Sequence, residues 1–509
     1  MMSKWPLHPA IYEINTWVWL SAIGARIGHG VDLSSVPAAE WDAIAKFGFE
    51  AVWLMGVWER SAACIAISNQ NQVLLDDFHH ALPDFRPEDN VGSAYSVRRY
   101  VVDPHLGGAE GLAAARRELA RRGIRLILDF VPNHVAPDHP WVHEHPEYFI
   151  CGGPEDARDD PATFATIEGQ VFARGRDPYF PAWPDVLQLN GFDPELRRAA
   201  IQTVVAIAGQ CDGIRCDMAM LLLNTIFERT WGRRAGPCPE AEYWAEVIPA
   251  VRERHLHFLF AAEAYWDREW DLQQLGFDYC YDKRLYDRLE HGDPESVRLH
   301  LSADPAYQTK LVRFIENHDE PRAAVAFAGR KREAAAVASA TLPGARLFYE
   351  DQFQGRSVRP AVFLARRPEE LPNEELGRFY EKLLRAVDDP LFHEGEWGLC
   401  GCTGWPDNLS FRNLVSWCWA RGEDRTIIVV NLSGEPAQSR VHLPWGDLRD
   451  SAWRLDDRLS DTVYDRDGVE MSEHGLYVSL EPWKYHLFQC SRAAAREKRR
   501  AGLMSTARS

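Results

Sequence analysis

The fold is decided by four short segments: Asp129-Phe-Val-Pro-Asn-His134, Gly213-Ile-Arg-Cys-Asp217, Phe260-Ala-Ala-Glu263 and Phe314-Ile-Glu-Asn-His-Asp319. Each opens with an apolar, strand-like run and ends on a carboxylate, a histidine or both. Apolar strands with polar tips are typical of parallel α/β barrels, at the face where the strands end and catalysis takes place. We therefore predict that the four tips meet at one end of a barrel.

Outside these segments, apolar strand-like runs alternate with helical patterns from Ile11 to Val387. Ala51 to Trp58 has the pattern of a buried strand, whereas Gly111 to Arg122 and Glu195 to Ala208 have helical spacing. Continuous apolar strands that alternate with amphipathic helices indicate a parallel sheet covered on both faces. About eight strands fit a closed (β/α)8 TIM barrel better than an open sheet.

The same patterns predict the domain organisation. The barrel is expected over residues 1–135 and 191–390. Residues 136–190 interrupt it after the third strand, and their many Pro, Gly, Asp and aromatic residues indicate an inserted subdomain over the catalytic face. Short strands separated by turns predict an antiparallel β-sandwich over residues 391–492. The basic, small-residue-rich stretch 493–509 is expected to be a disordered or frayed tail.

Composition excludes several classes of function. The chain has 509 residues, 46% of them apolar, and a formal net charge of −18. This charge argues against nucleic acid or an anionic membrane as a partner. The longest apolar runs are far shorter than a membrane span. The N-terminus has no continuous hydrophobic stretch of the secretory type, so we expect a cytoplasmic protein.

The polar tips suit the cleavage of a glycosidic bond, which needs one carboxylate to attack and another to protonate the leaving oxygen. Arg215 and Asp217 lie two residues apart on a strand and point to the same side, so the cation is expected to lower the pKa of Asp217, as suits a nucleophile. Glu263 follows an apolar run with no cation before it. Its pKa is therefore expected to be raised, as suits a general acid.

From Ile11 to Cys490 the chain resembles the α-amylase superfamily, glycoside hydrolase family 13, because all four segments match its signature segments in order. The resemblance implies that Asp217 is the nucleophile, that Glu263 is the acid/base and that Asp319 stabilises the transition state. It further implies that His134, Arg215 and His318 hold the sugar in the cleavage subsite and that Tyr95 is a stacking platform. Two tryptophans near strand tips, Trp58 and Trp266, are additional stacking candidates.

The sequence also departs from the family pattern. Many relatives carry Ala, Lys and His where this chain has Met218, Met220 and Leu221, so polar contacts to the leaving-group sugar are expected to be lost or replaced. The stretch Glu59 to Asn90 matches nothing in the family pattern. Asn133 corresponds to a calcium ligand in many relatives, which makes calcium a candidate ion; no other cofactor is implied.

We therefore expect a retaining α-glycosidase that acts on a small-molecule or oligosaccharide α-glucoside. The first alternative is a transglycosylase that passes the sugar to an acceptor other than water. The second is a carbohydrate-binding protein without activity, which the presence of all three carboxylates disfavours.

Overall fold

A computed structural model describes residues 4–493, which form two compact units. The first unit extends to Gly292 and resumes at Leu299–Asp389. The second unit contains Asp293–Arg298 and begins again at Pro390. Apart from Ala493, the predicted tail lies outside the described residues.

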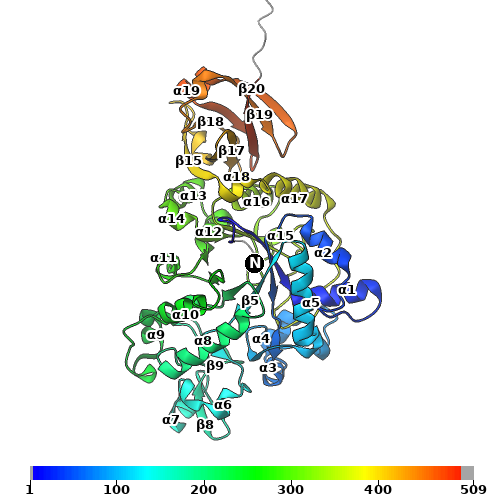
Figure 1. Ribbon diagram of the computed structural model, residues 1–509, viewed down its shortest axis with the longest axis vertical. Helices are drawn as coiled ribbons and strands as arrows, with labels where there is room; N and C mark the ends of the chain where they lie inside the picture. The colour runs from blue at the N-terminus through cyan, green and yellow to red at the C-terminus, as the bar shows by residue number, and fades with distance from the viewer. Residues whose placement is uncertain (1–3, 494–509) are drawn as a thin grey trace, which may run out of the picture. The chain divides into compact units, whose positions relative to one another are not determined.

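Eight parallel strands close into a barrel in the first unit (Figure 1). They follow the spatial order β1-β14-β13-β12-β11-β10-β5-β2. Their bounds are β1 (Ala10–Asn15), β2 (Ala51–Met55), β5 (Arg125–Phe130), β10 (Gly213–Cys216), β11 (Leu259–Ala262), β12 (Tyr279–Tyr281), β13 (Leu311–Arg313) and β14 (Ala345–Tyr349). The predicted (β/α)8 barrel is confirmed, and the four polar tips follow β5, β10, β11 and β13.

Helices stand around these strands (Figure 1). They include α2 (Ala38–Ala45), α5 (Gly108–Arg121), α8 (Pro194–Ala208), α10 (Tyr243–Arg252), α12 (Lys283–His291), α16 (Lys331–Thr341) and α17 (Glu374–Val387). Helix α8 shows how local sequence sets a boundary. The Asp193 side chain accepts a hydrogen bond from the amide of Leu196, and Pro194 occupies the first turn, where a missing amide hydrogen costs nothing.

The chain between β5 and α8 contains several small elements. These are β6 (His134–Val135), α6 (Trp141–Glu144), α7 (Pro154–Asp159), β7 (Phe164–Ile167), β8 (Gln170–Ala173) and β9 (Leu187–Gln188). Strand β6 pairs with β9, and β7 pairs with β8. Val135, Phe149, Phe172 and Leu187 belong to one small apolar cluster in this region, so the segment has a local core despite its weak periodicity.

The stretch Glu59 to Asn90 includes most of β3 (Trp58–Arg60), α3 (Ala62–Ser68) and α4 (Gln72–Ala81). It is followed by β4 (Val97–Val102), which pairs with β3. Phe78 and Leu82 are fully buried here and cluster with Ala361 and Leu364. This contact fixes α4 against the chain that follows β14.

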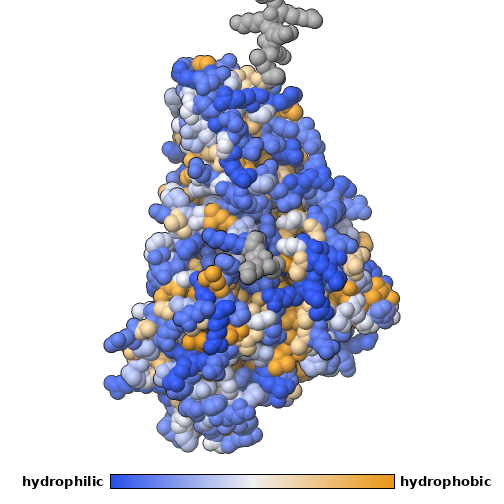
Figure 2. All heavy atoms as spheres, in the orientation of Figure 1, coloured by the Kyte–Doolittle hydropathy of each residue, from blue (hydrophilic) through white to orange (hydrophobic). Residues whose placement is uncertain are grey.

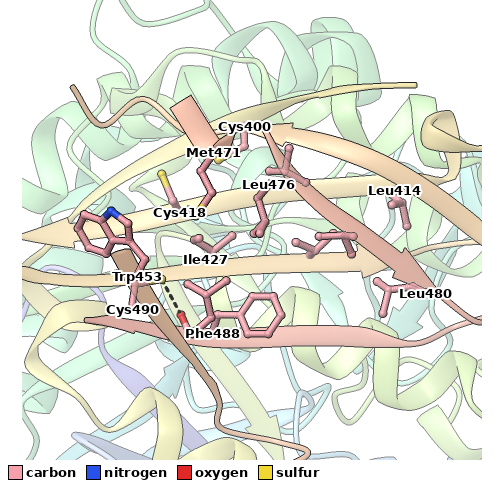
Figure 3. Packing of buried hydrophobic residues seen from close by; sticks show 14 of the residues in the cluster. Cys400, Leu414, Cys418, Ile427, Trp453, Met471, Leu476, Leu480, Phe488 and Cys490 are labelled. Carbon is pink, nitrogen blue, oxygen red and sulfur yellow. Dashed lines mark hydrogen bonds between the residues drawn. The ribbon is translucent and has the colours of Figure 1, made fainter. Parts of the chain in front are cut away.

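The second unit contains an eight-stranded antiparallel sheet with the order β20-β19-β22-β17-β16-β15-β18-β21. The strands are β15 (Glu396–Thr403), β16 (Leu414–Arg421), β17 (Asp424–Asn431), β18 (Ala437–His442), β19 (Ala452–Asp457), β20 (Thr462–Asp467), β21 (Leu476–Leu480) and β22 (Tyr485–Arg492). Trp453 of β19 and Leu476 of β21 share one apolar cluster with Ile427 (Figure 3). Strands far apart in the sheet order therefore bury side chains in a common core.

Polar residues cover most of the face shown in Figure 2, with apolar residues in small scattered groups. Scattered apolar residues of this kind are normal on a protein surface. Among residues 4–493, no helix has the length and apolar character needed to cross a membrane.

Candidate active site

The three carboxylates predicted to be catalytic line one cavity of about 440 Å³. Asp217 directly follows β10 and Glu263 directly follows β11. These strands are parallel neighbours, with Arg215 paired to Ala261, so the two residues emerge side by side. Asp319 lies beyond β13 and faces the same cavity. The structure thus brings together residues that lie about a hundred positions apart.

Arg215 lies between the first two carboxylates. Its side chain is almost wholly buried, with Nη1 2.8 Å from Asp217 Oδ1 and Nη2 2.8 Å from Glu263 Oε2. Asp129, the neighbour of Arg215 on β5, lies farther away, at 3.8 Å. One guanidinium therefore contacts two carboxylates, whereas the sequence pattern paired it with Asp217 and gave no contact to Glu263.

Burial of the site corrects our expectation for the pKa of Asp217. Burial raises the pKa of Asp217 and outweighs the opposing effect of Arg215, so the net shift is upward rather than downward. Burial likewise raises the pKa of Glu263, to about 7, although Arg215 opposes it. The prediction of a raised pKa at Glu263 is confirmed, but its surroundings include a cation.

Two further groups contact Glu263, and the sequence pattern did not reveal either. The Tyr265 hydroxyl donates to Oε1 at 2.9 Å, and the Met218 amide donates to Oε2 at 2.6 Å. Both residues line the cavity. Met218 has a φ of 41°, in the left-handed region, which is uncommon outside glycine. Tyr265 could have been suspected from its position two residues after Glu263.

His318 contacts both Asp319 and Glu13, which lies on the barrel strand β1. Its Nδ1 lies 2.5 Å from Glu13 Oε1, and its Nε2 lies 2.9 Å from Asp319 Oδ2 and 2.6 Å from the Tyr95 hydroxyl. Burial opposes the charged imidazole, but Asp319 and Glu13 outweigh it and raise the pKa of His318 to about 10. Burial would raise the pKa of Asp319, and His318 reverses this to about 2. An imidazolium next to a carboxylate is therefore the stable arrangement at neutral pH.

Tyr95 and His134 also line the cavity. The ring of Tyr95 stacks on His318 with centroids 5.2 Å apart, and the Arg215 guanidinium lies 5.0 Å from the ring centroid. Tyr95 thus contacts two other predicted site residues. Burial lowers the pKa of His134 to about 4, so its imidazole is neutral near pH 7. A neutral imidazole can donate a hydrogen bond to a sugar hydroxyl without competing for the carboxylates.

The two tryptophan candidates lie elsewhere. Trp58 is 2% exposed, and its indole nitrogen donates to the Asp129 carbonyl at 2.8 Å. A buried ring leaves no face for a sugar, so this expectation was wrong. Trp266 is half-buried and packs edge-to-face on Tyr179 with centroids 4.8 Å apart. It is not among the residues that line the cavity.

Met220 and Leu221 also lie away from the cavity. Both are buried in a short 3-10 helix, Ala219–Leu222, and neither lines the cavity. Of the three departures after the predicted nucleophile, Met218 lines the cavity. Further apolar lining comes from Val73 and Leu74 of α4, from Trp183, Pro184 and Val186, and from Phe363, so the stretch Glu59 to Asn90 forms part of the wall.

Asn133 does not have the surroundings of a calcium ligand. Its side-chain oxygen accepts a hydrogen bond from Gln188 at 2.9 Å. Across residues 4–493, no group of three or more His, Cys, Asp or Glu side chains is placed to hold a metal ion. Calcium prefers six to eight oxygen ligands, several of them carboxylates. The residues present here do not fit this ion.

A model of the α-amylase catalytic domain matches residues 38–274. The α-amylase MalA of Haloarcula japonica is 24% identical over 413 residues, 80% of this chain and 53% of that protein. An α-glucosidase of Culex pipiens is 24% identical over 240 residues, 44% of this chain and 35% of that protein. The chain thus matches about half or less of the length of these relatives.

Among solved structures, the α-amylase of Geobacillus thermoleovorans in complex with acarbose superposes with a TM-score of 0.65 at 18% identity, over 97% of this chain and 100% of that one. The trehalose-6-phosphate hydrolase of Bacillus licheniformis gives 0.66 at 14%, over 96% and 100%. These two likenesses concern the fold. The catalytic-domain match and the curated relatives agree with the resemblance of this chain to the α-amylase superfamily, glycoside hydrolase family 13.

Proposed function

We propose that this protein is a retaining α-glycosidase that acts on α-glucosides or short α-glucans. The observation that carries the proposal is the Arg215 guanidinium, 2.8 Å from each of two buried carboxylates that line one cavity. A shared cation holds the two carboxylates close together. Retaining enzymes need carboxyl groups about 5–5.5 Å apart, closer than inverting enzymes, which leave room for a water.

In the first half of the proposed cycle, Glu263 gives its proton to the glycosidic oxygen while Asp217 attacks C1 from the opposite side. A pKa of about 7 lets Glu263 carry this proton at neutral pH. The C1–O bond to the leaving group breaks, and a glycosyl ester forms on Asp217. Arg215 favours the ionised form of the attacking carboxylate.

In the second half, ionised Glu263 takes a proton from water as the water oxygen attacks C1. The ester bond breaks and its electron pair returns to Asp217. In this cycle Asp319 holds sugar hydroxyls with His318 behind it, and His134 donates a hydrogen bond from its neutral ring. No step requires a metal ion.

The test is Glu263→Gln, which keeps the shape of the side chain and removes the proton donor. We expect turnover of maltooligosaccharides, isomaltose, trehalose or sucrose, whichever the native chain accepts, to fall at least about 100-fold. Glu269→Gln is the matched control, because Glu269 is also buried with a pKa raised to about 7 but does not line the cavity. Equal activity of Glu263→Gln and native protein, or initial release of the β-anomer detected by NMR, would contradict the proposal.

Transfer to a sugar acceptor is the second candidate. Apolar side chains of α4, Met218 and Phe363 line the cavity, and such walls disfavour free water near C1. An α-1,4-glucan:maltose-1-phosphate maltosyltransferase of Cereibacter sphaeroides is 32% identical over 98 residues, 18% of this chain and 14% of that protein. Product analysis with and without added glucose or maltose separates the two reactions, since a transferase makes longer products at the expense of hydrolysis.

A further inference from the structure

The two oxygens of the Glu263 carboxyl group have different partners. Oε2 accepts from the Met218 amide at 2.6 Å and lies 2.8 Å from Arg215 Nη2. Oε1 accepts from the Tyr265 hydroxyl at 2.9 Å. A backbone amide and a guanidinium only donate hydrogen bonds, whereas a tyrosine hydroxyl donates and accepts.

The difference in partners determines which oxygen of Glu263 can carry the proton of the acid form. A proton on Oε2 would face an N–H group and a fixed cation, neither of which can accept it. A proton on Oε1 meets a hydroxyl that can rotate about its C–O bond and accept. We propose that Tyr265 is a positioning residue that makes Oε1 the oxygen through which Glu263 gives and takes its proton. The inference rests on the proposed function and adds to it a role for a residue outside the family signature segments.

Both proton transfers of the proposed cycle then take place at Oε1 of Glu263. In the resting acid, Oε1–H donates to the Tyr265 oxygen until a glycosidic oxygen replaces that acceptor. The proton passes from Oε1 to the leaving oxygen as the C1–O bond breaks, and Tyr265 turns to donate to the new carboxylate. In the second half, the water proton returns to Oε1 and Tyr265 turns back. Tyr265 gains and loses no proton overall.

The surroundings of Tyr265 suit this role. Its side chain is half-buried and lines the same cavity as Asp217 and Asp319. Burial raises the pKa of Tyr265 well above its ordinary value, and the charge of Glu263 raises it further. The side chain therefore stays a neutral hydroxyl throughout the neutral range, with one hydrogen to donate and lone pairs to accept.

Tyr265→Phe tests the inference through the pH dependence of catalysis. The lost hydrogen bond stabilises the ionised carboxylate more than the protonated one, because bonds to charged groups are the stronger. We expect the pKa of Glu263 to rise, and the basic limb of kcat/KM for an alkyl α-glucoside to move up by roughly 0.5–1 pH unit. An aryl α-glucoside has a leaving group that needs little protonation by Glu263. With this substrate at pH 6, the slowed step should be hydrolysis of the glycosyl enzyme, because that step needs ionised Glu263.

Tyr307→Phe is the matched control. Tyr307 is also half-buried in the barrel unit but does not line the cavity, so its loss of a hydroxyl should leave both pH limbs in place. A Tyr265→Phe enzyme with the native pH profile would overturn the inference. So would an equal displacement of the limbs in the control, since the shift would then not be specific to the Glu263 contact.

A second measurement needs no turnover. Carboxyl ¹³C NMR of protein labelled with ¹³C-glutamate, with the Glu263 signal assigned from Glu263→Gln, follows the titration of this residue directly. We expect a higher midpoint in Tyr265→Phe than in native protein, and an unchanged midpoint would overturn the inference. If the native chain cleaves no α-glucoside but the midpoint moves as expected, the proposed function fails and the control of the Glu263 pKa by Tyr265 stands.

Discussion

Glu13 and His318 lie 305 residues apart in the chain, yet Glu13 Oε1 lies 2.5 Å from His318 Nδ1. Both side chains are at most 1% exposed. The other ring nitrogen lies against Tyr95 and Asp319, so the first barrel strand supports the third predicted catalytic carboxylate through one imidazole. Glu13 lies in none of the four signature segments. In the closed barrel only β14 separates β1 from β13, so Glu13 on β1 lies close to the chain that follows β13.

Glu13→Gln should lower stability in a pH-dependent manner. The pKa of His318 is raised from 6.5 to about 10, so its contribution is complete below pH 6.5 and is lost as the pH rises through 10. We expect the variant to lose about 3 kcal/mol at pH 6 and much less near pH 10, measured by denaturant unfolding. Glu59→Gln, at a partly exposed site that pairs with Arg98 and Arg99, should cost less than about 1 kcal/mol at either pH. Equal losses at pH 6 and pH 10 would contradict the role given to His318.

Arg215→Lys should reduce kcat at least about 100-fold, because one ammonium cannot reach two carboxylates as a planar guanidinium does. Loss of the bridge leaves one buried carboxylate poorly compensated, so the basic limb of the pH profile should also move upward. Steady-state kinetics across pH 5–9 measures both effects. Arg116→Lys, at a partly exposed pair with Asp212, is the control. Near-native kinetics in Arg215→Lys would show that the bridge is not needed.

Glu263→Gln should be more stable than native protein at alkaline pH. The folded-state pKa of Glu263 is raised from 4.5 to about 7, so the stabilisation by this group is present below pH 4.5 and is lost as the pH rises through 7. The variant should match native protein near pH 4.5 and exceed it by roughly 1–3 kcal/mol at pH 8. Denaturant unfolding at the two pH values tests this. A variant less stable than native protein at pH 8 would mean that the ionised side chain stabilises the fold.

Val73→Ser should alter substrate binding with little effect on stability. Val73 lines the cavity although it is 76% exposed, so its apolar surface is available to a ligand. We expect KM for the preferred substrate to rise several-fold while the free energy of unfolding changes by less than about 0.5 kcal/mol. Leu371→Ser, at a side chain that is 95% exposed and does not line the cavity, should leave both values unchanged. An unchanged KM in Val73→Ser would show that Val73 of α4 does not contribute to substrate binding.

The barrel and its catalytic end could be predicted because strand tips carry their pattern within a few consecutive residues. The side-chain contacts between these tips could not be predicted, because they join residues on different strands of the barrel. Arg215 reaches Glu263 across β10 and β11, a contact that sequence spacing does not encode. Trp58 was misplaced for a related reason, since a tryptophan at a strand tip can turn toward the core. The wall from α4 depends on its packing against Ala361 and Leu364, far away in the chain.

Met218 supplies a hydrogen bond to Glu263 from its backbone and a side chain to the cavity. Replacement of the side chain leaves the amide donor in place, unless the new residue is proline. The left-handed backbone further favours Gly, Asn or Asp there over β-branched residues. Evolution can therefore change the cavity surface at this position while Glu263, the predicted acid/base, keeps its hydrogen-bond donor. In this chain, selectivity and chemistry are separable at a single residue.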